Sequence, residues 1–264
     1  MPVHYRTRFP LGVDMSKVAL RIAGAFMLMA VAAVAQEAVT SLLEKARAAY
    51  EARADAAQAA AAVEGFGVAA AANLGSYEAR WEGARACYFL GAVTREQADD
   101  DERIAIFADG IERAKAAIAL RPDGVEGHFW LGVLLGSWGE ARGVLKSLSV
   151  VPDIRREMEL CVAKEPSVEG WGPDRVLGRM YYKLPFFKGG DNKKSREYLE
   201  RSLAGAPTNA LTRLYLAETY KSMGEKAKAI EQLRAVLAMT PDPRWVAEYP
   251  GIRAKAEVLL RKLE

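Results

Sequence analysis

The chain has 264 residues, of which 51% are hydrophobic and 27% charged, with 37 lysines and arginines against 34 aspartates and glutamates. This composition can bury a core and argues against an intrinsically disordered or collagen-like chain. Two cysteines and two histidines argue against a disulfide-stapled miniprotein and against a metal centre rich in either residue. We therefore expect neither a metal nor a cofactor.

Residues 1–35 have the pattern of a secretory signal peptide. A short basic segment precedes an apolar run that ends in the small residues Ala33-Val34-Ala35, which form a cleavage site. The run is shorter than the roughly 20 residues that span a membrane, and no cysteine lies near it for lipid attachment. We predict a periplasmic or secreted protein, with Met15 as an alternative start of translation.

The basic excess of the chain belongs to this leader. Cleavage before Gln36 removes four basic residues and one acidic residue, which leaves 33 of each in residues 36–264. Binding to a phosphate backbone needs clustered positive charge, so we do not expect nucleic acid as a partner.

Residues 36–264 show helical spacing of apolar residues and almost no alternating strand pattern. The clearest unit, residues 209–241, follows the 34-residue tetratricopeptide pattern, in which small residues such as Ala217 and Ala229 let two antiparallel helices approach. The same spacing recurs upstream. We predict an all-α fold, a tetratricopeptide-repeat-like α-solenoid of about five helix pairs in a single domain. Prolines that cannot continue a helix close four units, and these are Pro122, Pro166, Pro207 and Pro241.

The two ends of the predicted stack differ from its middle. We expect a degenerate first pair at residues 37–52 and 55–73, and a final capping helix at residues 251–263. Three repeats carry extra residues between their two helices. Insertions at one point of a repeat emerge on one edge of a solenoid, and we expect function on that edge. The predicted insertions are residues 93–103, 137–153 and 184–194.

Several features that mimic chemical sites are better explained as structure. Gly65 and Gly67 imitate a dinucleotide-binding loop, but no strand precedes them. His128 is the one histidine left after cleavage and takes a helix-packing position, so we expect it in the core or half-buried. Cys87 and Cys161 are expected as buried thiols, and geometry decides whether they pair. Without a catalytic constellation we predict that the protein is not an enzyme.

A binding surface is the better prospect. The concave face of the predicted stack brings apolar and basic side chains together. Arginine forks hold carboxylates and aromatic side chains hold an apolar body, so we predict a small organic acid or a hydrophobic ligand. The alternative is that the aromatic side chains only pack and the cations are solvated. The candidates on this face are Glu82, Phe89, Phe129, Val133, Arg175, Arg179, Tyr182 and Lys183.

The third insertion contains Phe186 and Phe187 in a glycine-rich loop. Two adjacent phenylalanines cannot both face one helix core. We predict that one packs against the solenoid edge and that the other meets a partner or ligand. The alternative, that both are tucked under the loop, stays open.

Three segments give the sequence a resemblance to a known family. They are Gly127-His128-Phe129-Trp130-Leu131-Gly132, then Gly143-Val144-Leu145-Lys146-Ser147-Leu148, then Val176-Leu177-Gly178-Arg179-Met180-Tyr181-Tyr182-Lys183-Leu184-Pro185 with Gly189-Gly190. Together they resemble the T-component (TatT) family associated with TRAP transporters, over roughly residues 78–264. A similar helical core occurs in the regulator-of-microtubule-dynamics family, and the secretory leader favours the bacterial group.

The resemblance implies an all-helical, non-enzymatic periplasmic protein that is lined by a hydrophobic channel, pairs with a periplasmic solute-binding protein and assembles as a homotrimer. Known lipoprotein members have an anchoring cysteine where this chain has Gln36, so lipid anchoring is not supported. The first hypothesis is an accessory ligand-handling component of periplasmic solute uptake. The second is a protein–protein interaction scaffold of the cell envelope, which would hold a peptide or a partner helix on its concave face.

Overall fold

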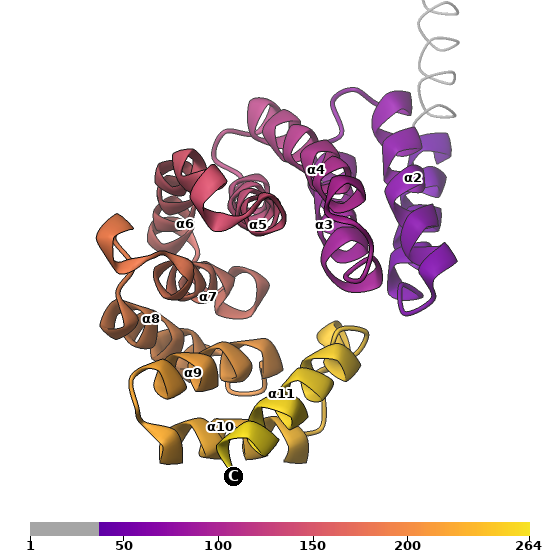
Figure 1. Ribbon diagram of the computed structural model, residues 1–264. Helices are drawn as coiled ribbons and strands as arrows, with labels where there is room; N and C mark the ends of the chain where they lie inside the picture. Colours follow the sequence, from indigo (N-terminus) through magenta and orange to yellow (C-terminus); the bar gives the residue numbers. More distant parts are fainter. Residues whose placement is uncertain (1–36) are drawn as a thin grey trace, which may run out of the picture.

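The computed structural model describes residues 37–264, and the predicted leader at residues 1–35 lies outside them. All regular structure in the described part is helical (Figure 1). After the helical residues 37–51, the longer helices are α2 (Ala56–Ala72), α3 (Tyr77–Phe89), α4 (Asp100–Leu120), α5 (Val125–Arg142), α6 (Val151–Lys164), α7 (Val168–Lys183), α8 (Asn192–Gly205), α9 (Ala210–Ser222), α10 (Lys226–Ala238) and α11 (Tyr249–Leu263). Four short helical turns connect them, namely η1 (Leu90–Thr94), η2 (Val144–Val150), η3 (Phe186–Lys188) and η4 (Pro243–Trp245).

The helices form antiparallel pairs that stack in chain order, so the predicted α-solenoid is confirmed (Figure 1). Each proline that was expected to close a unit follows a helix end. Pro122 comes after α4, Pro166 after α6, Pro207 after α8 and Pro241 after α10. Helices at residues 37–51 and 56–72 match the expected first pair, and α11 matches the expected capping helix.

Close contacts at small residues set the spacing of the stack. A Cβ atom on Gly110 of α4 would come within 2.8 Å of both Cys87 on α3 and Leu134 on α5. A Cβ atom on Gly178 of α7 would lie 2.6 Å from Leu199 on α8. Because real Cβ atoms do not approach so closely, these glycines let neighbouring helices pack at a distance that alanine would prevent.

The predicted insertions are shorter than expected. Helix α4 begins at Asp100, inside the expected first insertion, because the Asp99 side chain accepts a hydrogen bond from the Glu102 amide and caps the helix. The acidic run after Asp99 therefore forms the first helical turn, where negative charge is favourable, and not a separate solvated turn. Helix α5 likewise continues past residue 137 and ends at Gly143, whose φ of 88° suits glycine.

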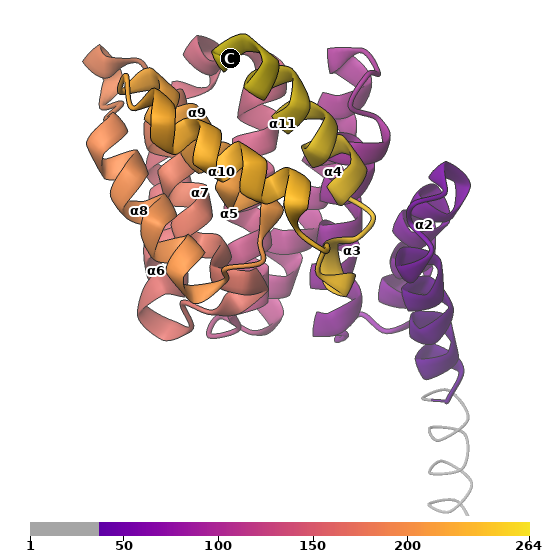
Figure 2. The same cartoon turned by 90° about the horizontal axis from the view of Figure 1, so that it is seen from below.

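The stack curves until its C-terminal end returns to its N-terminal end. In both views the segment that precedes α11 lies beside α3 (Figure 1, Figure 2). The buried guanidinium of Arg53, in the turn after the first helix, donates to the carbonyl oxygen of Arg244 at 2.7 Å and approaches the Glu248 carboxylate at 3.4 Å. Lys255 on α11 also pairs with Glu96 after η1. The concave face is thus partly covered by residues 241–252, which we call the closing segment.

Candidate ligand-binding cavity

A cavity of about 680 Å³ lies inside this curved stack. Its wall comes from α3, α5, α7 and α9 on one side and from the closing segment on the other. These four helices are the first members of their pairs, so tetratricopeptide-type packing turns one face of each toward the cavity.

Aromatic and aliphatic side chains of α3, α5 and α7 form the apolar part of the wall. The ring of Trp130 lies 5.1 Å from that of Phe129 and 5.5 Å from that of Tyr88, centroid to centroid. Val133 and Val176 extend this surface. Burial raises the pKa of the Tyr88 phenol, so its hydroxyl stays neutral near neutral pH. The wall can therefore hold an apolar body without carrying charge of its own here.

The backbone at the start of α7 has an unusual conformation. Glu169, Gly170 and Trp171 all have left-handed dihedral angles, with φ of 49°, 62° and 56°. Left-handed conformations cost energy for residues other than glycine, so the turn needs support. Arg175 supplies it, because its guanidinium donates to the carbonyl oxygens of Glu169 and Gly170 at 3.1 Å each. The Arg175 side chain is thus occupied in holding the cavity wall.

This turn places the Glu169 carboxyl group at a polar end of the cavity. Burial raises the pKa of Glu169, and nearby Arg85, Arg175, Arg244 and Arg53 oppose that shift. No ion pair within 4.0 Å joins Glu169 to any of them in the described part of the chain, in contrast to most buried carboxylates of the structure. The polar end therefore holds the Glu169 carboxyl group close enough to several guanidinium groups to feel their charge, without an ion pair to any of them.

The cations near the other end of α7 are neutralised by the protein itself. Arg179 forms an ion pair with Glu218, lies 3.7 Å from a carboxylate oxygen of Glu140, and stacks on the Tyr215 ring with its guanidinium carbon 4.1 Å from the centroid. Lys183 lies 3.6 Å from the same Glu140 carboxylate. The alternative that these cations are solvated is therefore wrong for Arg179, and its guanidinium reaches a ligand only by exchanging partners.

Five of the predicted site residues line the cavity, and these are Phe129, Val133, Arg175, Arg179 and Lys183. Tyr182 is half-buried outside the lining and packs against the Arg179 guanidinium. Glu82 and Phe89 face the first helix pair instead, where Glu82 pairs with Arg47 and the Phe89 ring meets the Tyr50 ring. Placing these two on the concave face was wrong, because the first pair packs over α3 and buries them.

The structure overturns both expected packing arrangements of the phenylalanine pair, whereas the contact of one ring with a partner or ligand stays a prediction. Phe186 is 91% exposed and Phe187 is 73% exposed, so neither plugs the solenoid edge and neither is tucked under the loop. Gly190 explains this arrangement, because its Cα lies against the Leu184 carbonyl so closely that a Cβ atom would come within 1.9 Å of that oxygen. The loop is a tight turn that leaves no room beneath it for a phenyl ring.

Sequence reasoning missed the closing segment and the Glu169 turn. The sequence does contain a signal for the closing segment, because Pro241-Asp242-Pro243 is followed directly by Arg244 and Trp245. Arg244 and Trp245 both line the cavity. The turn gives no comparable signal beyond one glycine.

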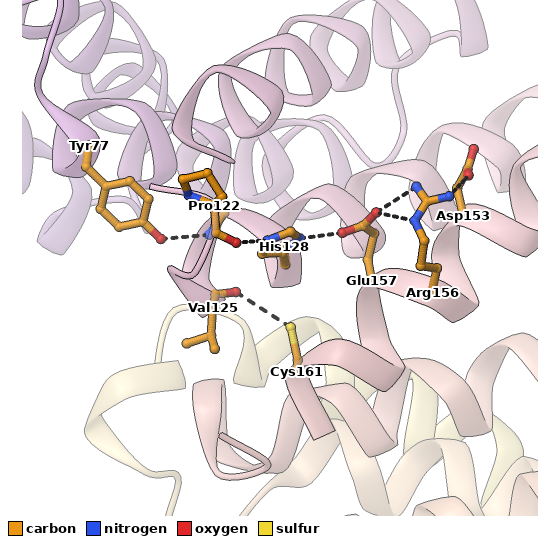
Figure 3. A network of polar contacts seen from close by, with 9 residues as sticks. Tyr77, Pro122, Val125, His128, Asp153, Arg156, Glu157 and Cys161 are labelled. Atoms are coloured by element: carbon orange, nitrogen blue, oxygen red, sulfur yellow. Dashed lines mark hydrogen bonds and ion pairs between the residues drawn. The ribbon is translucent and has the colours of Figure 1, made fainter. Parts of the chain in front are cut away.

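The one histidine of the described residues, His128, belongs to a structural network between α5 and α6 (Figure 3). The His128 Nε2 atom lies 2.9 Å from the Pro122 carbonyl oxygen, which only accepts, and Nδ1 lies 2.5 Å from Glu157. Glu157 also accepts two hydrogen bonds from Arg156, at 3.1 and 2.8 Å. Because the Pro122 carbonyl oxygen can only accept, the His128 Nε2 atom donates to it, and the predicted buried position of His128 is confirmed.

The cysteines are free and buried, as predicted. Burial raises the pKa of Cys87 and of Cys161 to about 12, so neither forms a reactive thiolate near neutral pH. Among residues 37–264, no group of three histidine, cysteine, aspartate or glutamate side chains is arranged to hold a metal ion. None of the helices described is both long enough and apolar enough to cross a membrane.

Comparison with known proteins identifies the repeat. A family model described as regulator of microtubule dynamics protein 1-3 matches residues 42–169, and one described as tetratricopeptide repeat matches residues 186–247. The crystal structure of TTC0263, a thermophilic TPR protein from Thermus thermophilus, superposes with a TM-score of 0.61 at 19% sequence identity, covering 83% of this chain and 99% of that one. The TPR domain of P58(IPK) is 17% identical over 86% of this chain and 66% of that one, but its TM-score of 0.28 is too low to support an argument. No curated protein matches the chain significantly.

Proposed function

We propose that this tetratricopeptide-repeat-like protein binds an amphipathic organic acid in its central cavity and does not transform it. The cavity of about 680 Å³ is the observation that supports this function. Its size lies within the range of roughly 300–1,000 Å³ typical of small-molecule sites. An apolar body would lie against Phe129 and Val133, and an acidic head would lie at the polar end near Arg85.

Unsatisfied polar atoms of the wall favour a ligand that accepts hydrogen bonds. Among the lining residues, Arg53, Arg85, Trp130 and Arg179 each have a buried N–H group without an acceptor. All four groups are donors. Buried donors without a partner are costly, and a carboxylate bound at the polar end would offer an acceptor to the Arg85 donor there. Arg85 makes no short ion pair, since its closest carboxylate oxygen, on Glu82, is 3.8 Å away, and its guanidinium carbon lies 4.2 Å from the centroid of the Tyr50 ring.

Tetratricopeptide-repeat proteins act in general as protein-interaction scaffolds with an open concave face. In this chain the closing segment lies across that face and supplies part of the cavity wall. A peptide would have to displace it, whereas a small molecule would not. This difference favours a small ligand in the cavity, and it leaves the outer surfaces for a protein partner.

For the setting of this function we propose the periplasm, after removal of residues 1–35, and an accessory role similar to that of the T-component of TRAP-type uptake systems. The support is the leader pattern and the three segments that resemble that family. The implied partner is a periplasmic solute-binding protein, and the implied assembly is a homotrimer. Cell fractionation with N-terminal sequencing tests the setting, and a cytoplasmic protein that keeps its leader would refute it.

A cavity-filling substitution tests ligand binding directly. Gly136 on α5 lines the cavity, and a Cβ atom there would meet no heavy atom within 4 Å. The variant Gly136→Phe therefore adds a Cβ atom without a clash, and we expect its phenyl group to occupy part of the cavity. Replacing a glycine within a helix also tends to stabilise it, by up to about 1 kcal/mol. We expect the variant to fold normally and to lose ligand.

The probe is anilinonaphthalene sulfonate, an aromatic anion whose fluorescence rises in apolar surroundings, followed by competition with medium-chain carboxylic acids. Gly251→Phe is the matched control. Gly251 lies in the closing segment on α11, but it is exposed, does not itself line this cavity and also has open space at its Cβ. We expect the affinity to fall at least about tenfold in Gly136→Phe only. Equal binding by both variants, or no displacement by any acid, would refute the proposed function.

A further inference from the structure

The phenylalanine loop after α7 is built to keep two phenyl rings in water. The amide of Lys188 donates to the Pro185 carbonyl at 2.9 Å, that of Gly189 to Phe186 at 3.1 Å, and that of Gly190 to Pro185 at 3.0 Å. Gly189 has a φ of 90°, which suits glycine. The rings of Phe186 and Phe187 are therefore presented by an ordered turn and do not result from a loose chain.

Basic residues follow these rings in the loop and in the helix after it. Lys188 lies next to Phe187, with its Nζ atom 5.9 Å from the ring centroid, and Lys193 and Lys194 are exposed on the first turn of α8. The one acidic residue of the loop, Asp191, is occupied as the cap of α8, because its carboxylate accepts from the Lys193 and Lys194 amides at 2.8 and 3.1 Å. The exposed apolar pair thus stands within a local excess of cations.

We propose that Phe186 and Phe187 dock the protein on an anionic membrane surface. Aromatic side chains favour the boundary between headgroups and acyl chains, and lysines near an anionic leaflet add electrostatic attraction. A protein partner would need a pocket shaped to fit both projecting rings. A lipid surface accepts a pair of rings on a narrow turn without such a pocket. The complementary charge of the lysines identifies the lipid as anionic.

The position of the loop gives this docking a consequence for the cavity, which rests on the proposed function. Leu184 and Lys183, immediately before the loop, line the cavity, and so do Val150 and Val151 at the end of η2. A docked loop would hold this end of the cavity at the lipid surface. An amphipathic acid could then pass between the bilayer and the cavity without crossing much water.

Vesicle binding tests the docking without reference to any ligand. The full chain is mixed with vesicles of phosphatidylcholine alone and of phosphatidylcholine with phosphatidylglycerol, and bound protein is separated by flotation. We expect the double variant Phe186→Ser, Phe187→Ser to bind the anionic vesicles at least about tenfold more weakly than the original chain. Leu74→Ser is the matched control, because Leu74 is 73% exposed, as Phe187 is, but lies in the turn between α2 and α3. It is expected to bind as the original chain does.

A site-specific label separates docking by this loop from membrane binding by any other part of the chain. Cys87 and Cys161 are buried, so a nitrobenzoxadiazole label reacts selectively at Phe187→Cys or at the control Leu74→Cys. We expect a blue shift on anionic vesicles at position 187 and none at 74, weakened by added salt. No shift at 187, an equal shift at both sites, or a Phe186- and Phe187-dependent dimer without vesicle binding would overturn the proposal. If Gly136→Phe loses ligand binding but still binds vesicles, the docking proposal stands, because docking and ligand binding are then separate properties.

Discussion

Replacing Arg53 by methionine should loosen the closing segment. The change keeps an unbranched, buried side chain but removes the donors that reach the Tyr50 carbonyl at 3.1 Å and the Arg244 carbonyl at 2.7 Å. It also removes the cation 3.4 Å from Glu248. Breaking a buried ion pair costs about 3–5 kcal/mol, but Glu248 keeps 17% of its side chain exposed, so the lower figure applies. We expect the free energy of unfolding to fall by about 3 kcal/mol.

Urea unfolding followed by circular dichroism measures this change, and hydrogen exchange locates it. The exchange of backbone amides in residues 241–252 should accelerate more than that of α5 and α7, because the segment loses its attachment to the N-terminal pair. The control is Glu248→Gln, which keeps the shape and an acceptor oxygen and should cost less than about 1 kcal/mol. A loss below about 1 kcal/mol in Arg53→Met, with unchanged exchange in the segment, would show that this contact does not hold the cavity closed.

Three further substitutions test other parts of the structure. Burial raises the folded-state pKa of Glu169 above its ordinary value of 4.5, so its contribution to stability is fully present below about 4.5 and is lost as pH rises through the folded-state value. Glu169→Gln should therefore be more stable than the original chain at pH 7 and show no such advantage at pH 4, by urea unfolding, and a gain that persists at pH 4 would contradict this sign. His128→Phe removes the hydrogen-bond partner of the Pro122 carbonyl and of one Glu157 oxygen and should cost about 2–4 kcal/mol, since two buried polar groups each lose a partner, whereas a cost under about 1 kcal/mol would mean that the network is dispensable. Gly178→Ala brings a Cβ atom within 2.6 Å of Leu199 and should lower the melting temperature by several degrees, corresponding to about 1–3 kcal/mol, and an unchanged melting temperature would show that α7 and α8 separate freely.

Local patterns predicted the helices well because the relevant interactions are local. Prolines and helix caps act within a few residues, so Pro122 and Pro207 indicate helix ends without any knowledge of tertiary structure. The repeat spacing then fixes which faces pack, and five candidate residues were placed on the inner wall for this reason. The same reasoning failed at Phe89, where a degenerate first pair covers α3.

The cavity closure could not be predicted because it depends on contacts between distant segments. Arg53 and Glu248 are 195 residues apart, and no periodic pattern links them. The exposed phenylalanine pair was also mispredicted, because hydrophobic residues are normally buried and the turn that prevents burial depends on the close approach of Gly190 to a carbonyl oxygen. Both features depend on backbone positions that emerge only when the whole stack is assembled.

The contact between Arg53 and Arg244 also bears on how the repeat can evolve. An open array of helix pairs can grow or shrink by one unit at either end, since each unit touches only its neighbours. Here the two ends meet, so the circumference of the array is fixed by the geometry of its pairs. Inserting or deleting one helix pair would move Arg244 away from Arg53 and break the contact between the two ends. Selection for an intact cavity would therefore keep the number of helix pairs constant.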